Sequence, residues 1–173
     1  MSAGPGVTRY AIAMQLDAED ASTYCNRGIV WHNKGEHDKA IRDFTEAIQL
    51  DPKYTNAYHN RGVAWLKVGK YDMSIKDYTE AIRLAPTDVE FVAAIARAYA
   101  KSGDYKKAVE WQTKAVDMAL ESEKSTYWQN LDLYRLGEDR AERNERERAT
   151  RNVVSVVFAL LLWGGASLVR LSG

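Results

Sequence analysis

The chain has 173 residues, which is room for one modest domain with tails. Its basic and acidic residues balance at 24 Lys and Arg against 24 Asp and Glu. A net charge of zero provides no positive field to recruit phosphates, which argues against a nucleic-acid-binding protein, and the single cysteine, Cys25, excludes an internal disulfide.

The first twenty residues contain part of a motif that recurs later. Residues 13–17 read AMQLD, and residues 47–51, which lie 34 positions further on, read AIQLD. We therefore predict a partial repeat, or N-terminal segment, over residues 1–20.

Residues 21–52 and 55–86 are two copies of nearly one sequence, set 34 residues apart. A period of this size indicates a helical-repeat array, and a more divergent third copy follows, so we predict three repeats over residues 21–120. The positions of the first copy that recur unchanged in the second are Tyr24, Asn26, Arg27, Gly28, Trp31, Gly35, Asp38, Ile41, Asp43, Thr45, Glu46, Ala47, Ile48, Leu50 and Pro52.

Each copy reads as two antiparallel helices. Gly35, Gly69 and Gly103 stand where the first helix would end, because glycine adopts the left-handed conformation that closes a helix at little cost. Pro52 and Pro86 would stop the second helix.

Two positions 16 residues apart change together between the copies. The pairs are Arg27 with Asp43, Arg61 with Asp77, and Ile95 with Trp111. Since these positions lie at similar heights in an antiparallel hairpin, we expect two Arg–Asp ion pairs, within a copy or with its neighbour, and one apolar contact, all with a structural role.

This pattern resembles the tetratricopeptide repeat family over roughly residues 10–120. The similarity rests on a succession of Trp/Tyr, Gly, Tyr, Ala, Phe/Tyr, Ala and Pro. The sequence pattern YxNRG…AIxDxTEAIxLxP is similar to the common bacterial form of the repeat. The resemblance implies an all-α fold, a right-handed superhelical stack of helix-turn-helix hairpins. It also implies a scaffold that binds a partner protein or extended peptide in a concave groove.

The first helix of each copy would line that groove. Asparagine suits the backbone of an extended peptide because its side chain offers both a donor and an acceptor, although Asn26 and Asn60 could equally bond within the array. The candidate ligand-binding residues are Asn26, Asn33, Asn56, His59, Asn60 and Lys67.

The sequence contains no nucleophile–base pair, phosphate-binding loop or paired acid motif, so we predict no catalytic residue, no cofactor and no enzyme activity. Cys25, His32 and His59 could come near one another on the inner wall, but their spacing matches no zinc signature, and we predict no metal site.

One subtype of the family binds the acidic C-terminal tails of chaperones through Lys, Asn and Arg. The matching positions here are Cys25, Ile29, Asn60, Glu90 and Ala94. Of these only Asn60 fits, and Glu90 would repel a carboxylate, so the resemblance does not extend to this clamp and we predict no binding of a chaperone tail.

Beyond the repeats we predict two further helices. Tyr127, Leu131 and Tyr134 share one stripe, which indicates a capping helix over residues 121–137. Residues 138–151 are charged and net neutral, as in a solvated helix. Its candidate ion pairs at i,i+4 spacing are Asp139–Arg143, Glu142–Arg146 and Glu147–Arg151.

The last part of the chain is apolar. Residues 153–169 carry no charge, and their 17 residues are at the short limit for a membrane-spanning helix, so we predict a transmembrane helix over residues 152–172. Arginines are more frequent before this segment than after it, which predicts a single-pass protein with its repeat domain on the cytoplasmic side. The alternative is a soluble homo-oligomeric repeat protein that buries the apolar helix at a subunit interface.

Overall fold

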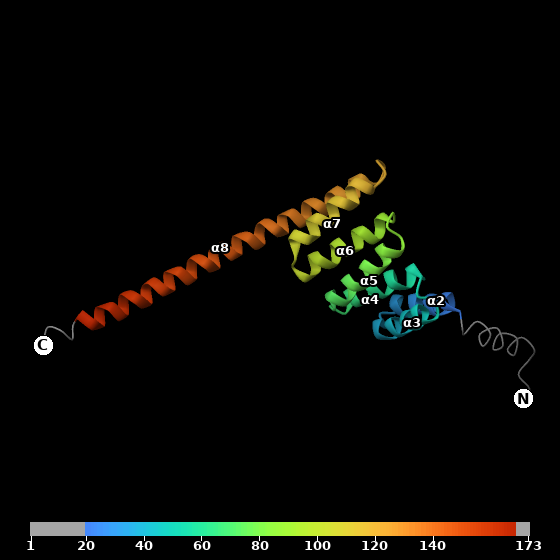
Figure 1. Ribbon diagram of the computed structural model, residues 1–173, viewed down its shortest axis with the longest axis horizontal. Helices are drawn as coiled ribbons and strands as arrows, with labels where there is room; N and C mark the ends of the chain where they lie inside the picture. The colour runs from blue at the N-terminus through green and yellow to red at the C-terminus, as the bar shows by residue number, and fades with distance from the viewer. Residues whose placement is uncertain (1–19, 169–173) are drawn as a thin grey trace, which may run out of the picture.

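The computed structural model describes residues 20–168, with side chains through residue 156 (Figure 1). The predicted partial repeat over residues 1–20 therefore lies almost wholly outside the described residues. Within the described range the chain forms seven helices and no strand. The helices are α2 (Ala21–Asn33), α3 (His37–Leu50), α4 (Thr55–Lys67), α5 (Tyr71–Leu84), α6 (Val89–Ser102), α7 (Tyr105–Met118) and α8 (Lys124–Leu168).

Three helical hairpins stack in chain order: α2 with α3, α4 with α5, and α6 with α7 (Figure 1). The second helix of each hairpin packs against the first helix of the next element, and the first helices also touch one another. This all-α stack confirms the helical array that the 34-residue period predicts.

The glycines at the end of each first helix have the predicted conformation. Gly35, Gly69 and Gly103 have φ angles of 80°, 78° and 90°, in the left-handed region that other residues rarely adopt. Asp20 and Asp88 cap the N-termini of α2 and α6 by accepting hydrogen bonds from the backbone N–H groups two residues on.

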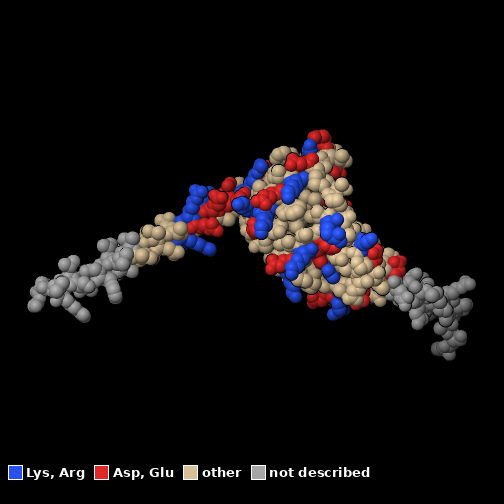
Figure 2. Space-filling model, in the orientation of Figure 1, with Lys and Arg blue, Asp and Glu red and all other residues tan. Residues whose placement is uncertain are grey.

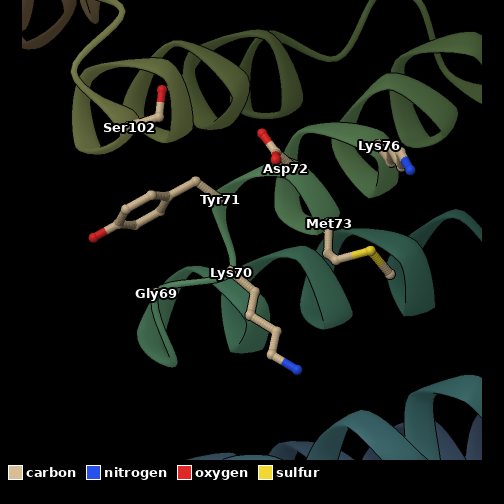
Figure 3. Close-up of a pocket in the computed structure, with 7 residues that line it drawn as sticks. All are labelled: Gly69, Lys70, Tyr71, Asp72, Met73, Lys76 and Ser102. Carbon is tan, nitrogen blue, oxygen red and sulfur yellow. The ribbon is translucent and has the colours of Figure 1, made fainter.

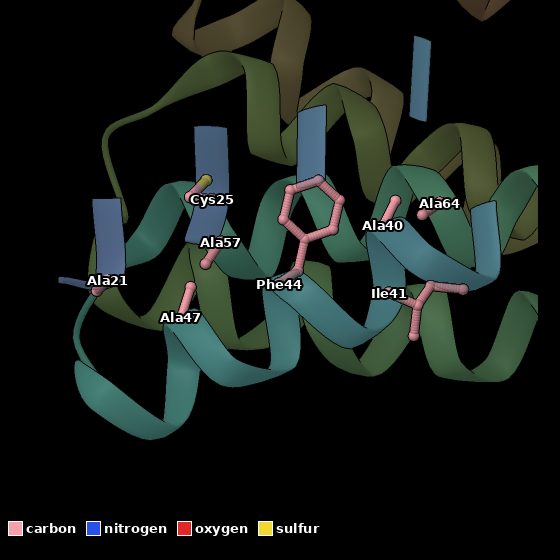
Figure 4. Packing of buried hydrophobic residues seen from close by; sticks show 8 residues of the cluster. All are labelled: Ala21, Cys25, Ala40, Ile41, Phe44, Ala47, Ala57 and Ala64. Carbon is pink, nitrogen blue, oxygen red and sulfur yellow. The ribbon is translucent and has the colours of Figure 1, made fainter. Parts of the chain in front are cut away.

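Small residues allow the two helices of a hairpin to approach closely. Phe44 is 1% exposed, and a Cβ atom built on Gly28 would lie 2.6 Å from its ring. Gly62 stands in the same relation to Tyr78, at 2.8 Å. Figure 4 shows the Phe44 ring of α3 among alanines of its own and the neighbouring copy. A side chain at either glycine would force the hairpin apart.

Both predicted Arg–Asp pairs form, and both are bidentate. Arg27 donates to Asp43 at 2.7 and 2.8 Å, and Arg61 donates to Asp77 at 2.8 Å through two nitrogens. Arg61 also donates to the Thr45 hydroxyl of the preceding copy at 3.1 Å, so it joins two copies as well as two helices.

The third copy replaces the ion pair with an apolar contact, as predicted. Ile95 is 1% exposed and lies in one cluster with Trp111 and with Tyr78 of the second copy. Ile95 and Trp111 thus occupy the space that the ion pair fills in the other copies. An apolar pair can replace the ion pair because its burial requires no desolvation of charges.

Helix α8 begins as the capping element. Its Leu131 is fully buried, and the Gln112 side chain of α7 donates to the backbone carbonyl of Tyr127 at 2.9 Å. Gly137 lies under the ring of Tyr105, where a Cβ atom would collide with it. The helix does not end at this glycine, so the segments predicted as a cap and as a charged helix run as one continuous helix.

Residues 138–145 of α8 still line a cavity together with the start of α7. Beyond them the helix projects away from the stack (Figure 1). Figure 2 shows acidic and basic side chains interleaved along this stretch. Of the three ion pairs predicted there, only Glu142–Arg146 forms, at 3.4 Å. Arg143 and Arg151 instead donate to the backbone carbonyls of residues 139 and 147, because exposed ion pairs gain too little to hold long side chains in one geometry.

Over the residues that the structure describes, none of the helices combines the length and the apolar character that crossing a membrane requires. The backbone of α8 continues to Leu168, but the side chains of residues 157–168 and all of residues 169–173 lie outside the described part. Most of the segment predicted as a transmembrane helix, residues 152–172, falls in that region.

The buried Arg61–Asp77 pair should matter more to stability than its exposed counterpart. Burial raises the pKa of Asp77 and Arg61 opposes that rise, so the ionised carboxylate depends on its partner. We expect Arg61→Leu to lower the free energy of unfolding by about 3 kcal/mol at pH 7. The loss should be smaller near pH 4, because protonation removes the unpaired charge; urea unfolding followed by circular dichroism measures both values.

Arg27→Leu is the matched control. The Arg27 side chain is 54% exposed, compared with 18% for Arg61, so its removal should cost only about 1 kcal/mol or less. Equal losses for the two variants, or a loss for Arg61→Leu that does not change with pH, would contradict this account.

Candidate protein-binding groove

The inner wall of the stack is formed by the first helices. Helices α2, α4, α6 and the start of α8 contact one another in sequence, whereas the second helices are separated by them. The first helices are therefore on the side of smaller radius, which is the concave side of a helical-repeat array. The capping helix thus supplies a fourth element of the wall.

Asn60 lies on this wall but makes a contact within the protein. Its side-chain nitrogen donates to the Sγ atom of Cys25, on the preceding first helix, at 3.7 Å. Cys25 is 1% exposed, and burial raises the pKa of its thiol, which keeps it neutral. The amide of Asn60 thus joins two copies, and its carbonyl oxygen forms no hydrogen bond with any described residue.

His59 lies at the junction of α4 and α6. Its ring is 5.0 Å from that of Phe91 and 5.7 Å from that of Tyr78, and its Nε2 atom is 3.8 Å from a carboxylate oxygen of Glu90. Burial lowers the pKa of His59 and Glu90 partly offsets that effect. Its Nδ1 atom is buried with no hydrogen-bond partner among the described atoms.

The other four predicted groove residues, Asn26, Asn33, Asn56 and Lys67, are all exposed. Their side chains form no hydrogen bond or ion pair within the part of the chain that the structure describes. Asn26 is equivalent to Asn60, but no described copy precedes it to receive its amide. Of the six predicted residues, His59 and Asn60 are the two for which the structure shows a specific side-chain contact with a neighbouring first helix.

A groove of about 430 Å³ lies between α6 and the start of α8. It has two carboxylates, Glu90 and Glu123, and one guanidinium, that of Arg97, which forms no ion pair with any described residue. Its other lining residues are Ala93, Ser122, Thr126, Tyr127 and Asn130.

This groove was not among the predicted site residues. The sequence shows Tyr127 only as a member of the apolar stripe of a cap. In the structure Tyr127 packs against the cluster of Val92, Ala93 and Ala115 and also lines the groove. The position of the capping helix in the sequence could have indicated this groove. A capping helix that follows the last hairpin takes the place of the next first helix, so it also extends the inner wall.

A larger cavity, about 570 Å³, lies elsewhere (Figure 3). It is formed at the turn between α4 and α5 and is lined by Lys70, Tyr71 and Met73, with Ser102 from the end of α6. It lies at the helix ends and not on the first-helix wall, so we do not assign it to the groove.

Within the described residues no group of three or more His, Cys, Asp or Glu side chains is arranged to hold a metal ion. His32 and His37 do approach, with ring centroids 4.8 Å apart, but the contact is a tilted ring packing of two side chains.

Models of the tetratricopeptide repeat match residues 21–54, 55–88 and 89–121, which together are more than half of the chain. These ranges coincide with the three hairpins. No curated protein matches the chain.

Three similar solved structures are domains of this type, and their likeness establishes the fold. The Arabidopsis OM64 domain has 22% identity and a TM-score of 0.62, over 68% of this chain and 95% of that one. The Sgt2 domain from Aspergillus fumigatus has 20% identity and a TM-score of 0.63, over 71% and 82%. The second domain of human RPAP3, solved with the HSP70 peptide SGPTIEEVD, has 24% identity and a TM-score of 0.62, over 66% and 94%.

The burial of His59 predicts a pH-dependent stability. A histidine whose folded pKa is lowered contributes stability that is present above its unfolded pKa, near 6.5, and is lost as the pH falls. We therefore expect the free energy of unfolding to decrease from pH 7.5 to pH 5, and His59→Asn to make that decrease smaller. His32, whose pKa burial also lowers, should account for part of the remainder.

Urea unfolding at several pH values measures the effect. Asn56→Ala, an exposed substitution in the same helix, should keep the full pH dependence. If His59→Asn leaves the pH dependence as large as in the unchanged protein, the burial of His59 is not its source.

Proposed function

The chain belongs to the tetratricopeptide repeat family, and from this premise we propose that it is a non-catalytic scaffold that binds a partner protein in its concave groove. The partner would present an extended segment, which lies along the first helices and contacts several of them at once. Relatives of this fold bind peptides, as the human RPAP3 domain does with its HSP70 peptide.

One observation carries the proposal: the inner wall is continuous over four helices and carries polar groups that have no partner among the described residues. At the centre the carbonyl oxygen of Asn60 has no described partner. The Nδ1 atom of His59 also has none, but it is buried and lies out of reach of a peptide. At the far end Arg97 faces the 430 Å³ groove without an ion pair among the described residues. A peptide backbone supplies donors and acceptors for such groups, and an acidic side chain would suit Arg97.

We further propose that the partner is not the acidic C-terminal tail of a chaperone, although that is the peptide in the RPAP3 structure. Such a tail needs positive charge at the clamp positions. Here Cys25 and Ala94 are uncharged and buried, and Glu90 places a carboxylate where a carboxylate would have to bind. Arg97 lies one turn away from Ala94 and cannot replace the whole clamp.

We also propose that the chain is held at a membrane by its C-terminal segment. The support is sequence and the described start of that segment: residues 153–169 carry no charge, and Val153, Val154 and Val156 are 63%, 56% and 59% exposed. Apolar side chains exposed together, at the start of an uncharged segment, are typical of a surface that contacts lipid or protein. A tether would raise the local concentration of a membrane-bound partner, so that a weak groove could suffice.

The orientation follows from the arginines. Five arginines precede the apolar segment between residues 140 and 151, and only Arg170 follows it. Positive flanks stay in the cytoplasm, so the groove would face that side. The alternative is a homo-oligomer in which the apolar segment is buried between subunits.

Substitutions in the groove should reduce partner capture. With the full chain as bait, Asn60→Asp and Arg97→Glu should each reduce recovery of a specific set of proteins by about tenfold, since central groove contacts are worth about 1.4 kcal/mol or more. Quantitative mass spectrometry of the captured proteins gives the ratio. Glu110→Gln, an exposed change on α7, is the control and should change nothing.

The same protein allows a direct test of the excluded partner. The peptide SGPTIEEVD should show no binding in isothermal titration calorimetry at micromolar concentrations. A micromolar complex would refute this exclusion.

If neither Asn60→Asp nor Arg97→Glu reduces recovery in the capture experiment, the partner binds to another surface of the protein.

Carbonate extraction tests the membrane anchor. If the C-terminal segment spans a bilayer, the full chain stays in the membrane pellet at alkaline pH, and a chain with Leu160→Arg and Leu161→Arg is released, because central arginines each oppose insertion by about 3 kcal/mol. Complete release of the unchanged chain would favour the oligomeric alternative.

A further inference from the structure

The inner wall carries its charged side chains in two rows of opposite sign. The acidic row lies at the start of the first helices, with Asp88 and Glu90 at the start of α6 and Glu123 just before α8. The basic row lies toward the end of the first helices, with Lys67 in the last turn of α4 and Arg97 in α6. Since the helices of each hairpin alternate in direction, all first helices run the same way, and like ends lie beside one another along the stack.

The groove between α6 and the start of α8 contains groups from both rows. Glu90 and Arg97 are seven residues apart on α6, which separates them by roughly 10 Å along the helix axis. Glu123 reaches the groove from the opposite side. Within ion-pair distance Glu90 has only the Nε2 atom of His59 among the described residues, at 3.8 Å, and burial lowers the pKa of His59, which favours its neutral form. The groove thus presents charges of both signs that the described protein does not neutralise.

Two tyrosines of α8 respond to these charges in opposite ways. Burial raises the pKa of Tyr127, and the negative charges of Glu123 and Glu90 add to that rise. Burial also raises the pKa of Tyr134, one helical stripe further along α8, but the positive charge of Arg97 opposes the rise. The potential in the groove therefore changes from negative at one end to positive at the other.

Asn60 indicates how an extended segment would lie on this wall. Its side-chain carbonyl oxygen has no partner among the described residues and accepts a hydrogen bond from a backbone N–H group. The hydrogen-bonding edge of the segment would then face the wall, and the segment would run across the first helices from one copy to the next. Successive side chains of an extended chain point to opposite sides, so they would reach the acidic row and the basic row in turn.

We propose that the partner segment has a basic residue directly beside an acidic residue, with the basic side chain between Glu90 and Glu123 and the acidic side chain against Arg97. This inference rests on the proposed groove function and names the chemistry of the partner. A purely acidic segment would place a carboxylate against Glu90, and a purely basic one would place a cation against Arg97. The groove therefore selects a neighbouring pair of opposite charges and rejects either charge alone.

Selection from a library of random peptides displayed on phage tests the proposal. The bait is the full chain, immobilised in a nonionic detergent that covers its apolar C-terminal segment. The enriched peptides should have Lys or Arg next to Asp or Glu more often than the unselected library. Fluorescence anisotropy with one enriched, labelled peptide then gives its affinity for the unchanged chain and for each variant.

Exchanging charges between peptide and groove identifies the contacts. Changing the basic residue of the peptide to glutamate should weaken its binding about tenfold, and the chain with Glu90→Lys and Glu123→Lys should recover that loss. Changing the acidic residue of the peptide to lysine should weaken binding by a similar factor, and the chain with Arg97→Glu should recover it. Asp117→Lys, the same charge change at an exposed position of α7, is the control and should recover neither peptide.

The experiment separates a failure of this inference from a failure of the groove. If Asn60→Asp weakens the binding of enriched peptides, but these peptides lack the neighbouring charges or the exchanges restore nothing, the groove binds a partner and the inference is wrong. If Asn60→Asp and Arg97→Glu leave the binding of the enriched peptides unchanged, or no peptide is enriched, the proposed groove is wrong and the inference is overturned with it.

Discussion

The structure depends on how closely two helices of a hairpin approach. Phe44 packs where Gly28 has no side chain, and Tyr78 packs in the same way over Gly62. Because each hairpin is the surface on which the next one packs, an error in this separation would pass along the whole stack. The fully buried alanines of the core, such as Ala47 and Ala57, also allow neighbouring helices to approach closely. Small side chains thus set the geometry, and aromatic rings supply the buried area.

The ion pairs are a second layer on this packing. Arg61 binds Asp77 in its own copy and Thr45 in the preceding one, so it fixes both the hairpin and the stacking. The third copy fills the corresponding space with Ile95 and Trp111. The same site can therefore be satisfied by paired charges or by apolar packing, provided that neither partner is left alone.

Helix α8 combines roles that a repeat array usually separates. Its first turns cap the core through Leu131 and extend the groove through Asn130. It then passes Gly137 without a break and becomes a charged helix outside the stack. The residues after Gly137 explain the absence of a turn, because Arg143 and Arg146 occupy the positions of Ile41 and Phe44 and could not form the buried face of a second helix.

The repeating sequence by itself determined the helices, their pairing and their order, and it predicted the Arg–Asp contacts, because each depends on a local period or on neighbours within one copy. The left-handed glycines followed for the same reason. Only the tertiary structure decided that the Asn60 amide donates a hydrogen bond to Cys25 and that His59 is buried against Phe91, since these contacts join separate copies. It also decided that Glu123, Tyr127 and Arg97 meet in one groove. Contacts between copies depend on the rotation from one hairpin to the next. Packing of the whole stack sets that rotation, so it cannot be predicted from any single segment of the sequence.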